Sequence, residues 1–111
     1  MFCCSQNKTD SIKQEDEVMD LIARLPEVIK ADEYVIKKTK GKRHLFTYIY
    51  LRPTNAENYY TVNVAEDNGS TYYTHFHFAV DPITYAKAYY DPFNDRYVPI
   101  KIWRKHHKEF I

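Results

Sequence analysis

Apolar and polar positions follow two different periods along the chain, a helical one near the N-terminus and a strand-like one after it. Between residues 12 and 29 the apolar positions recur every three or four residues, which places them on one face of a helix. Proline suits the first turn of a helix better than its interior, so Pro26 predicts a break near Leu25 and a short second helical turn over residues 27–31. The apolar face of the predicted helix consists of Val18, Met19, Ile22, Leu25, Val28 and Ile29.

Strand-like runs fill most of the remaining chain. They are rich in aromatic and β-branched residues and are bounded by turn formers, as short strands are. The Asn68-Gly69 pair supplies the positive φ angles of a tight hairpin turn, and the other connections are also short, so we expect successive strands to pair antiparallel as a meander. The expected strands cover residues 44–51, 58–65, 71–80 and 85–90, with a further extended run at 97–100 and a short edge element at 34–36.

These elements predict a single α+β domain. Because one amphipathic helix covers only one face of a sheet, we expect the N-terminal helix to pack on one face of a four-stranded antiparallel meander sheet. Residues 102–110 are expected to form a short C-terminal helical cap, with Trp103 against the sheet. The chain of 111 residues has the size of one domain, which we place at 15–111 after a flexible tail or tether at 1–14.

The strand expected at 71–80 has one face that packs in the core and one face whose side chains could bind a partner or a metal. Regular alternation sends its even-numbered residues towards the helix and sends Tyr73, His75 and His77 outward. Tyr59 of the preceding strand is expected on the same outward side. Tyrosine offers a large, rigid contact area and is enriched at interfaces, although it is also a good former of exposed strands. We take Tyr59, Tyr73, His75 and His77 as the candidate surface for a protein partner.

Metal and nucleophilic chemistry find little support in the sequence. His75 and His77 lie two residues apart, so both imidazoles would project from one side of a regular strand. A third ligand would have to come from His44, Asp81 or Glu66, and no Cys-x-x-Cys or His-Glu-x-x-His pattern supplies one. The cysteines and serines lie in the tail or at turns, which are poor positions for a preorganised nucleophile. We expect no metal, no cofactor and no enzymatic activity.

The charge balance favours a protein partner over nucleic acid. Sixteen basic and fifteen acidic residues leave a formal net charge of +1, so the chain has no global field that attracts a polyanion. Aromatic sheet faces also stack single-stranded RNA in ribonucleoprotein-type domains, but the Arg/Lys-Gly-Phe signature of those domains is absent here. We expect a monomer that binds a protein, with a membrane contacted only through a lipid anchor.

The two cysteines are adjacent and lie outside every periodic segment. Their adjacency disfavours a disulfide between them, and the polar stretch at 5–14 follows them as a tether follows the acylated cysteine of bacterial lipoproteins. We take Cys3 and Cys4 as candidate lipid-attachment sites. Only Met1 and Phe2 precede the pair, so a lipoprotein signal would require an upstream translation start. S-palmitoylation of a cytoplasmic protein and an unmodified thiol pair are the alternatives.

The order of elements, followed by the segment Phe78-Ala-Val-Asp-Pro-Ile-Thr84, resembles that of the PepSY and cystatin-like small α+β domains. In PepSY-type sequences a strand commonly ends in Val-Asp-x-x-Thr-Gly, which Val80, Asp81 and Thr84 match, while Tyr85 stands in the place of the glycine. Together with the cysteine pair, the chain is also similar to small uncharacterised lipoproteins of Bacteroidetes. This resemblance implies a non-enzymatic binding or inhibitory module of the bacterial cell envelope, lipid-anchored or secreted, and it carries over no catalytic residue.

Two other functions remain open at this level. One is a cytoplasmic immunity-type protein that neutralises a toxin, in which the cysteine pair is incidental. The other is a cystatin-like cavity enzyme, in which a curved sheet wraps a polar pocket.

The lipid-anchor hypothesis predicts a diacylglycerol group on Cys3 or Cys4 of the mature protein in its native host. Mass spectrometry of the N-terminal peptide from cell-envelope fractions measures this modification directly. An N-terminal peptide that begins with unmodified Met1 and carries free thiols would contradict the hypothesis.

Overall fold

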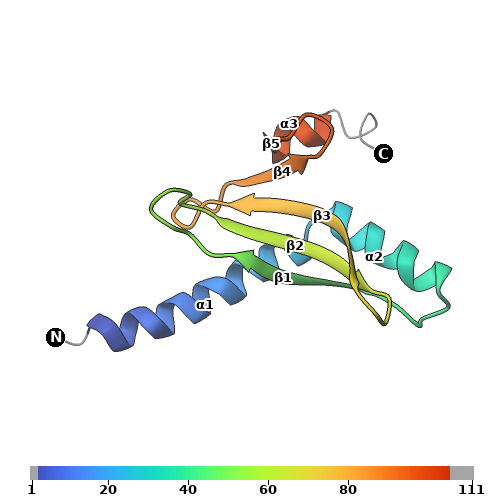
Figure 1. Cartoon of the computed structure of the whole chain (residues 1–111), viewed down its shortest axis with the longest axis horizontal. Helices are drawn as coiled ribbons and strands as arrows, with labels where there is room; N and C mark the ends of the chain where they lie inside the picture. Colours follow the sequence, from blue (N-terminus) through green and yellow to red (C-terminus); the bar gives the residue numbers. More distant parts are fainter. Residues whose placement is uncertain (1–2, 106–111) are drawn as a thin grey trace.

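The structure, a computed structural model, describes the backbone of residues 3–105 and the side chains of residues 12–105. Two N-terminal helices precede an open antiparallel sheet of five strands, and a short helix follows it (Figure 1). The helices are α1 (Cys3–Ala23), α2 (Pro26–Lys38) and α3 (Ile100–Lys105). The strands are β1 (Leu45–Leu51), β2 (Tyr60–Asp67), β3 (Tyr72–Val80), β4 (Lys87–Asp91) and β5 (Arg96–Pro99).

The break between α1 and α2 confirms the prediction from proline. Leu25 has an extended backbone, with φ −60° and ψ 134°, and Pro26 occupies the first turn of α2, where its missing N–H leaves no hydrogen bond unmade. The predictions of a short helical turn at 27–31 and of a strand-like edge element at 34–36 are wrong, because α2 continues through both segments. Val35 is buried two helical turns after Val28, on the same face of α2, so the helical spacing prevails over the local β propensity.

Helix α1 begins at Cys3, so most of the segment predicted as a flexible tail has a helical backbone. Its N-terminal half runs clear of the sheet (Figure 1). Gln14 marks the point where α1 meets the sheet, since its amide donates to the Pro82 carbonyl over 2.7 Å and accepts from the Tyr60 hydroxyl over 2.7 Å. The division between a segment at 1–14 and a domain at 15–111 stays a prediction.

The sheet is a meander in the order β1-β2-β3-β4-β5, as predicted, but it has one strand more than expected. The run at 97–100 supplies the additional strand, because Tyr97 and Val98 pair with Tyr90 and Tyr89 of β4. A short C-terminal helix is present as predicted: it covers Ile100–Lys105, and the part of the predicted cap at 106–110 lies outside the described residues. Its Trp103 is buried with its ring stacked 4.5 Å from that of Tyr89.

One face of the sheet forms the core. The even-numbered residues Tyr60, Val62 and Val64 of β2 and Phe78 and Val80 of β3 are buried there, as the alternation predicts. Helices α1 and α2 cover these strands from one side, and Trp103 of α3 packs on the same face through the ring of Phe78. The helices contribute Val18, Ile22, Leu25, Val28 and Val35 to this core.

The turn between β3 and β4 places Tyr85 at φ +60°, in the left-handed region that favours glycine. The Asp81 carboxylate accepts hydrogen bonds from the backbone N–H groups of Ile83 and Thr84, and these bonds lower the pKa of Asp81. Tyr85 occupies the position at which the PepSY-type motif has glycine, and its positive φ is one that glycine adopts readily. The resemblance itself stays a prediction.

Substitution of the core residue Ile22 by alanine should destabilise the protein strongly. Its side chain is 0 % exposed, so the change leaves a cavity and should lower the free energy of unfolding by about 2–5 kcal/mol. Ile12→Ala is the matched control, because Ile12 lies on the same helix and is 59 % exposed, and it should change stability by less than about 0.5 kcal/mol. Urea unfolding measures both. Equal losses for the two variants would contradict the packing of α1.

Candidate functional site: an aromatic sheet face and an edge groove

The face of the sheet that the helices leave uncovered carries aromatic rings on β1, β3, β4 and β5, and Tyr59 lies directly before β2. Cross-strand partners share a face, so the pairs Tyr48↔Asn63 and Asn63↔His77 place Tyr48 and His77 on this side. The pair Tyr90↔Tyr97 adds the last two strands. We define the aromatic face as Phe46, Tyr48, Tyr50, Tyr59, Tyr72, His77, Tyr90 and Tyr97.

The rings of the aromatic face form two groups. In the first, Phe46 stacks on Tyr48 with centroids 5.6 Å apart and meets the ring of Tyr72 edge-on at 4.9 Å. These separations lie in the range in which aromatic pairs attract each other. The three rings therefore hold one another over the end of the β1–β2–β3 sheet.

His77 is the centre of the second group. Its ring lies 6.1 Å from Tyr50, 5.4 Å from Tyr90 and 6.2 Å from Tyr97, and Tyr59 reaches the group through Tyr97 at 5.7 Å. Burial among these rings lowers the pKa of His77 below its usual 6.5, because desolvation disfavours the imidazolium. The ring is therefore neutral at neutral pH and acts as part of an uncharged aromatic surface.

Small side chains of β2 lie beneath the rings. Thr61, Asn63 and Ala65 belong to the uncovered face, yet all three are buried. The Asn63 amide donates to the Tyr48 hydroxyl over 3.2 Å, while its Oδ1 is buried with no hydrogen-bond partner among the described residues. The aromatic face is thus a packed layer whose outer surface is made by the rings.

A β-bulge in β3 divides the four residues predicted as one surface. Val64 pairs with Phe76, but Ala65 pairs with Thr74, so His75 is one residue extra and the alternation changes phase there. Before the bulge, Tyr73 pairs with Glu66 on the side of the helices. The expectation of a single outward row is therefore wrong. Tyr59 and His77 lie on the aromatic face, whereas Tyr73 and His75 do not.

His75 belongs instead to an ionic cluster at the end of the sheet. Its Nε2 lies 3.1 Å from Glu66 Oε1, and Arg43 donates to the other carboxylate oxygen over 3.2 Å. The hydrogen bond with His75, followed by that from Arg43, lowers the pKa of Glu66. His75 and His77 lie on different faces and cannot act as a pair. Among the described side chains, those of residues 12–105, no three His, Cys, Asp or Glu groups are placed together to hold a metal ion.

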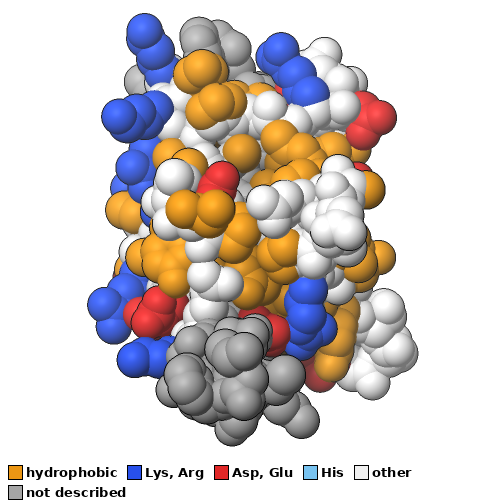
Figure 2. All heavy atoms as spheres, turned by 90° about the vertical axis from the view of Figure 1, so that its left-hand side faces the viewer, with side chains coloured by type: hydrophobic (Ala, Val, Ile, Leu, Met, Phe, Trp, Pro, Cys, Tyr) orange, Lys and Arg blue, Asp and Glu red, His pale blue; other side chains and the backbone are white. Residues whose placement is uncertain are grey.

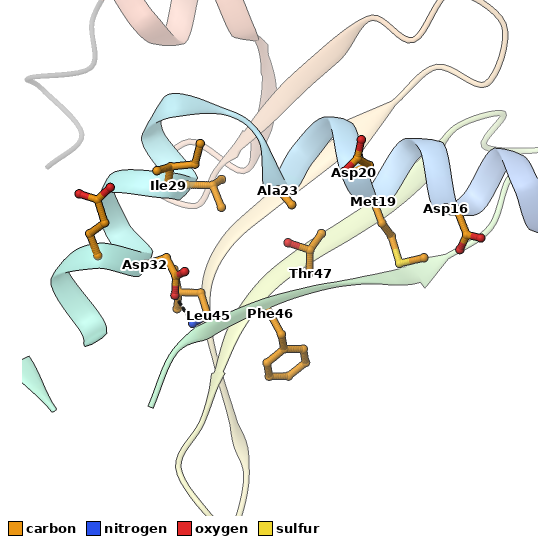
Figure 3. A pocket seen from close by; sticks show the side chains of 11 residues that line it. Asp16, Met19, Asp20, Ala23, Ile29, Asp32, Leu45, Phe46 and Thr47 are labelled. Carbon is orange, nitrogen blue, oxygen red and sulfur yellow. Dashed lines mark hydrogen bonds between the residues drawn. The ribbon is translucent and has the colours of Figure 1, made fainter. Parts of the chain in front are cut away.

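A groove of about 620 Å³ lies between the two N-terminal helices and β1 (Figure 3). Its wall includes the apolar side chains of Met19, Val28, Ile29 and Leu45, and this volume falls in the range of ligand pockets. Acidic side chains from both helices complete the lining: Asp16, Asp20, Asp32 and Glu33. The groove forms only where two helices meet the edge of a strand, so no local sequence pattern predicts it.

Apolar side chains also reach the surface at one end of the molecule. The β1–β2 and β3–β4 connections lie together there (Figure 1), and Figure 2 shows hydrophobic surface across this end with Lys and Arg side chains beside it. Leu51 and Ile83 are among the exposed apolar residues of these two segments.

The candidate lipid-attachment residues lie at the start of α1, and their side chains are outside the described part of the chain. Within residues 3–105, none of the helices combines the length and the apolar character that a bilayer crossing requires. No protein-family model matches the chain, and no curated protein or solved structure is similar enough to it to count as a match.

The position of His77 predicts its titration. Proton NMR of the imidazole should give a pKa below 6.5, and Tyr97→Ala, which removes part of the aromatic cover, should move this pKa back towards 6.5. A wild-type pKa at or above 6.5 would contradict the burial of this ring.

The same shift sets the sign of a pH effect on stability. The unfolded chain protonates His77 near 6.5 and the folded ring only at lower pH, so unfolding takes up a proton between these values and stability falls as the pH drops. Urea unfolding at about pH 7.5 and about pH 5.5 should show this loss, and His77→Gln should reduce it. An identical pH dependence in the variant would count against this assignment.

Proposed function

We propose that this protein is a non-enzymatic binding module that engages a protein partner through the aromatic face. The observation that carries the proposal is the layer of aromatic rings, in two groups, on the sheet face that none of the described helices covers. Large aromatic side chains dominate the energetics of interfaces when a partner desolvates them. The helices already cover the opposite face of the sheet, so the aromatic face is the one accessible to a partner.

The chemistry of the face resembles the centre of a protein interface. The aromatic face contains no Asp, Glu, Lys or Arg. Few charged residues and many tyrosines are typical of the centre of a protein interface. Charged side chains stand at its border, where Lys42, Arg43 and Asp67 surround a hollow of about 390 Å³ beside Tyr72. A partner with an apolar and hydrogen-bonding centre fits this arrangement.

Ring packing also favours affinity. Each ring is held by at least one neighbour, for example Tyr90 by both His77 and Tyr97, so a partner would immobilise few side chains on binding. Preorganisation of this kind reduces the entropy lost in association. A location in the bacterial cell envelope and the immunity-type alternative both stay predictions, and the identity of the captured partner would distinguish them.

Two neighbouring tyrosines provide a matched test. Tyr72 belongs to the aromatic face and Tyr73 lies on the other side of the sheet, and their exposures are similar at 57 % and 63 %. A partner captured from host extract by wild-type protein should bind Tyr72→Ser at least about tenfold more weakly, a loss of about 1.4 kcal/mol, because a desolvated ring contact is removed. Tyr73→Ser should bind as wild type does.

Calorimetry with the purified partner measures these affinities, and thermal unfolding checks that both variants fold. The double variant Tyr50→Ser/Tyr90→Ser extends the test to the second ring group. Loss of binding in Tyr73→Ser with retention in Tyr72→Ser would move the interface to the other side of the sheet. Capture of single-stranded nucleic acid in place of a protein would overturn the proposal.

A further inference from the structure

We propose that the groove beside β1 is a second binding site, which takes an extended, lysine- or arginine-bearing segment of a partner polypeptide as an added strand. The site is separate from the proposed function, because only Phe46 contributes to both the groove and the aromatic face. Its three components are an open strand edge, an apolar floor and a set of carboxylates.

The open edge belongs to β1, which ends the sheet on one side. The backbone N–H of Leu45 points away from β2, since it donates to Asp32 Oδ1 over 2.7 Å, and the Leu45 carbonyl lies 3.1 Å from the His44 ring. Backbone orientation in an antiparallel strand repeats every second residue, so the N–H and C=O of Thr47 point outward as well. Among the described residues, no side chain or loop hydrogen-bonds to the Thr47 backbone.

An unpaired edge of this kind accepts another strand through main-chain hydrogen bonds. Asp32 and His44 occupy the edge at Leu45, which sets one limit of the site. The irregular register between Ile49 and Leu51 sets the other, because a regular ladder cannot continue through it. A short segment centred on Thr47 therefore fits the edge, and a long strand does not.

The carboxylates select the charge of that segment. Figure 3 shows Asp32 at the start of β1 beside Leu45 and Asp16 towards the other end of the groove. Asp20 pairs with Arg24 over 3.1 Å, while Asp16 and Glu33 have no ion pair or side-chain hydrogen bond among the described residues. Carboxylates thus stand at both ends of an edge that lacks a partner strand, Asp32 at one end and the unpaired Asp16 at the other.

The apolar floor explains why long cations fit better than short ones. On an added strand, alternate side chains face the helices at intervals of about 7 Å. Lysine or arginine stems at these positions can lie along Met19 and Ile29, with the charged ends at the carboxylates. The intervening side chains face the other side of the sheet, next to Phe46, where apolar residues are suited. The expected ligand therefore alternates cationic and apolar residues.

Three synthetic peptides test the site: Ac-Lys-Val-Lys-Thr-Lys-Val-amide, the same sequence with glutamate for lysine, and the lysine peptide with N-methylated backbone at its lysines. In an antiparallel added strand, the residues whose side chains lie on the side of Thr47 are the ones whose N–H groups point at β1. NMR titration of the full chain should show binding of the first peptide, with the largest amide shifts at Thr47 and Ile49. The glutamate peptide should not bind, and the N-methylated peptide should bind at least about tenfold more weakly, because it cannot complete the ladder.

Protein variants then locate the binding energy. Asp16→Asn/Glu33→Gln should weaken the lysine peptide about fivefold, as expected for partly exposed ion pairs, whereas Arg24→Ala should strengthen it by freeing Asp20. Asp67→Asn, on the hairpin outside the groove, is the matched control for charge and should have no effect. Tyr72→Ser should leave peptide binding unchanged, so failure here is distinct from failure of the proposed function.

Several results would overturn the inference. Equal binding of the N-methylated peptide would show a charge effect without strand addition. Competition by a long-chain alkylammonium ion, with no shift at Thr47, would assign the groove to a small amphiphile. Protection of the Thr47 amide that increases with protein concentration in the absence of peptide would assign the edge to a second copy of the chain.

Discussion

The packing of all three helices on a single face of the sheet is the constraint on which the remaining structure depends. Val18 and Ile22 of α1 belong to the same core as Val62, Val64 and Phe78 of the sheet, and all five side chains are fully buried. Burial of this kind contributes about 1.5–3 kcal/mol for each aliphatic side chain. All the helices of residues 3–105 pack on one side, so none of them covers the other face of the sheet.

On the uncovered face, tyrosine rings take the place of a helix in shielding the sheet from water. An aromatic ring can bury the small side chains beneath it and still present its polar hydroxyl to water, which an aliphatic side chain cannot do. Thr61 and Ala65 are buried in this way without any second layer of secondary structure. The same rings that protect the sheet from solvent form the surface proposed for a partner, so stability and binding depend on the same residues.

Polar contacts position the helices on the sheet and thereby create the edge groove. Glu15 of α1 accepts two hydrogen bonds from Arg52, over 2.8 and 2.9 Å, and Glu27 of α2 accepts two from Arg104 of α3, over 3.0 and 3.5 Å. Exposed ion pairs contribute little to stability individually, but they act here on helices already held by the core. The break at Pro26 turns α2 so that Asp32 reaches the start of β1, and the space between is the groove.

The sequence by itself determined the elements whose periodicity is local. The α+β class, the helix break before Pro26, the meander and the buried even-numbered residues of β2 all follow from spacing within one segment, because burial of a stripe or a face requires that spacing. The extent of α2 was not determined in this way, since Tyr34-Val35-Ile36 favours a strand locally and becomes helical only because Val35 fits the core.

Tertiary structure alone decided which residues share a surface. The bulge at His75 changes the phase of β3, so Tyr72 joins Phe46 and Tyr48 while Tyr73 moves to the opposite side. A one-residue change of phase exchanges the faces of every side chain beyond it, and the pairing between strands sets that phase, not the sequence of either strand alone. For the same reason the acidic groove, which joins two helices to a strand edge, exists only in the folded chain.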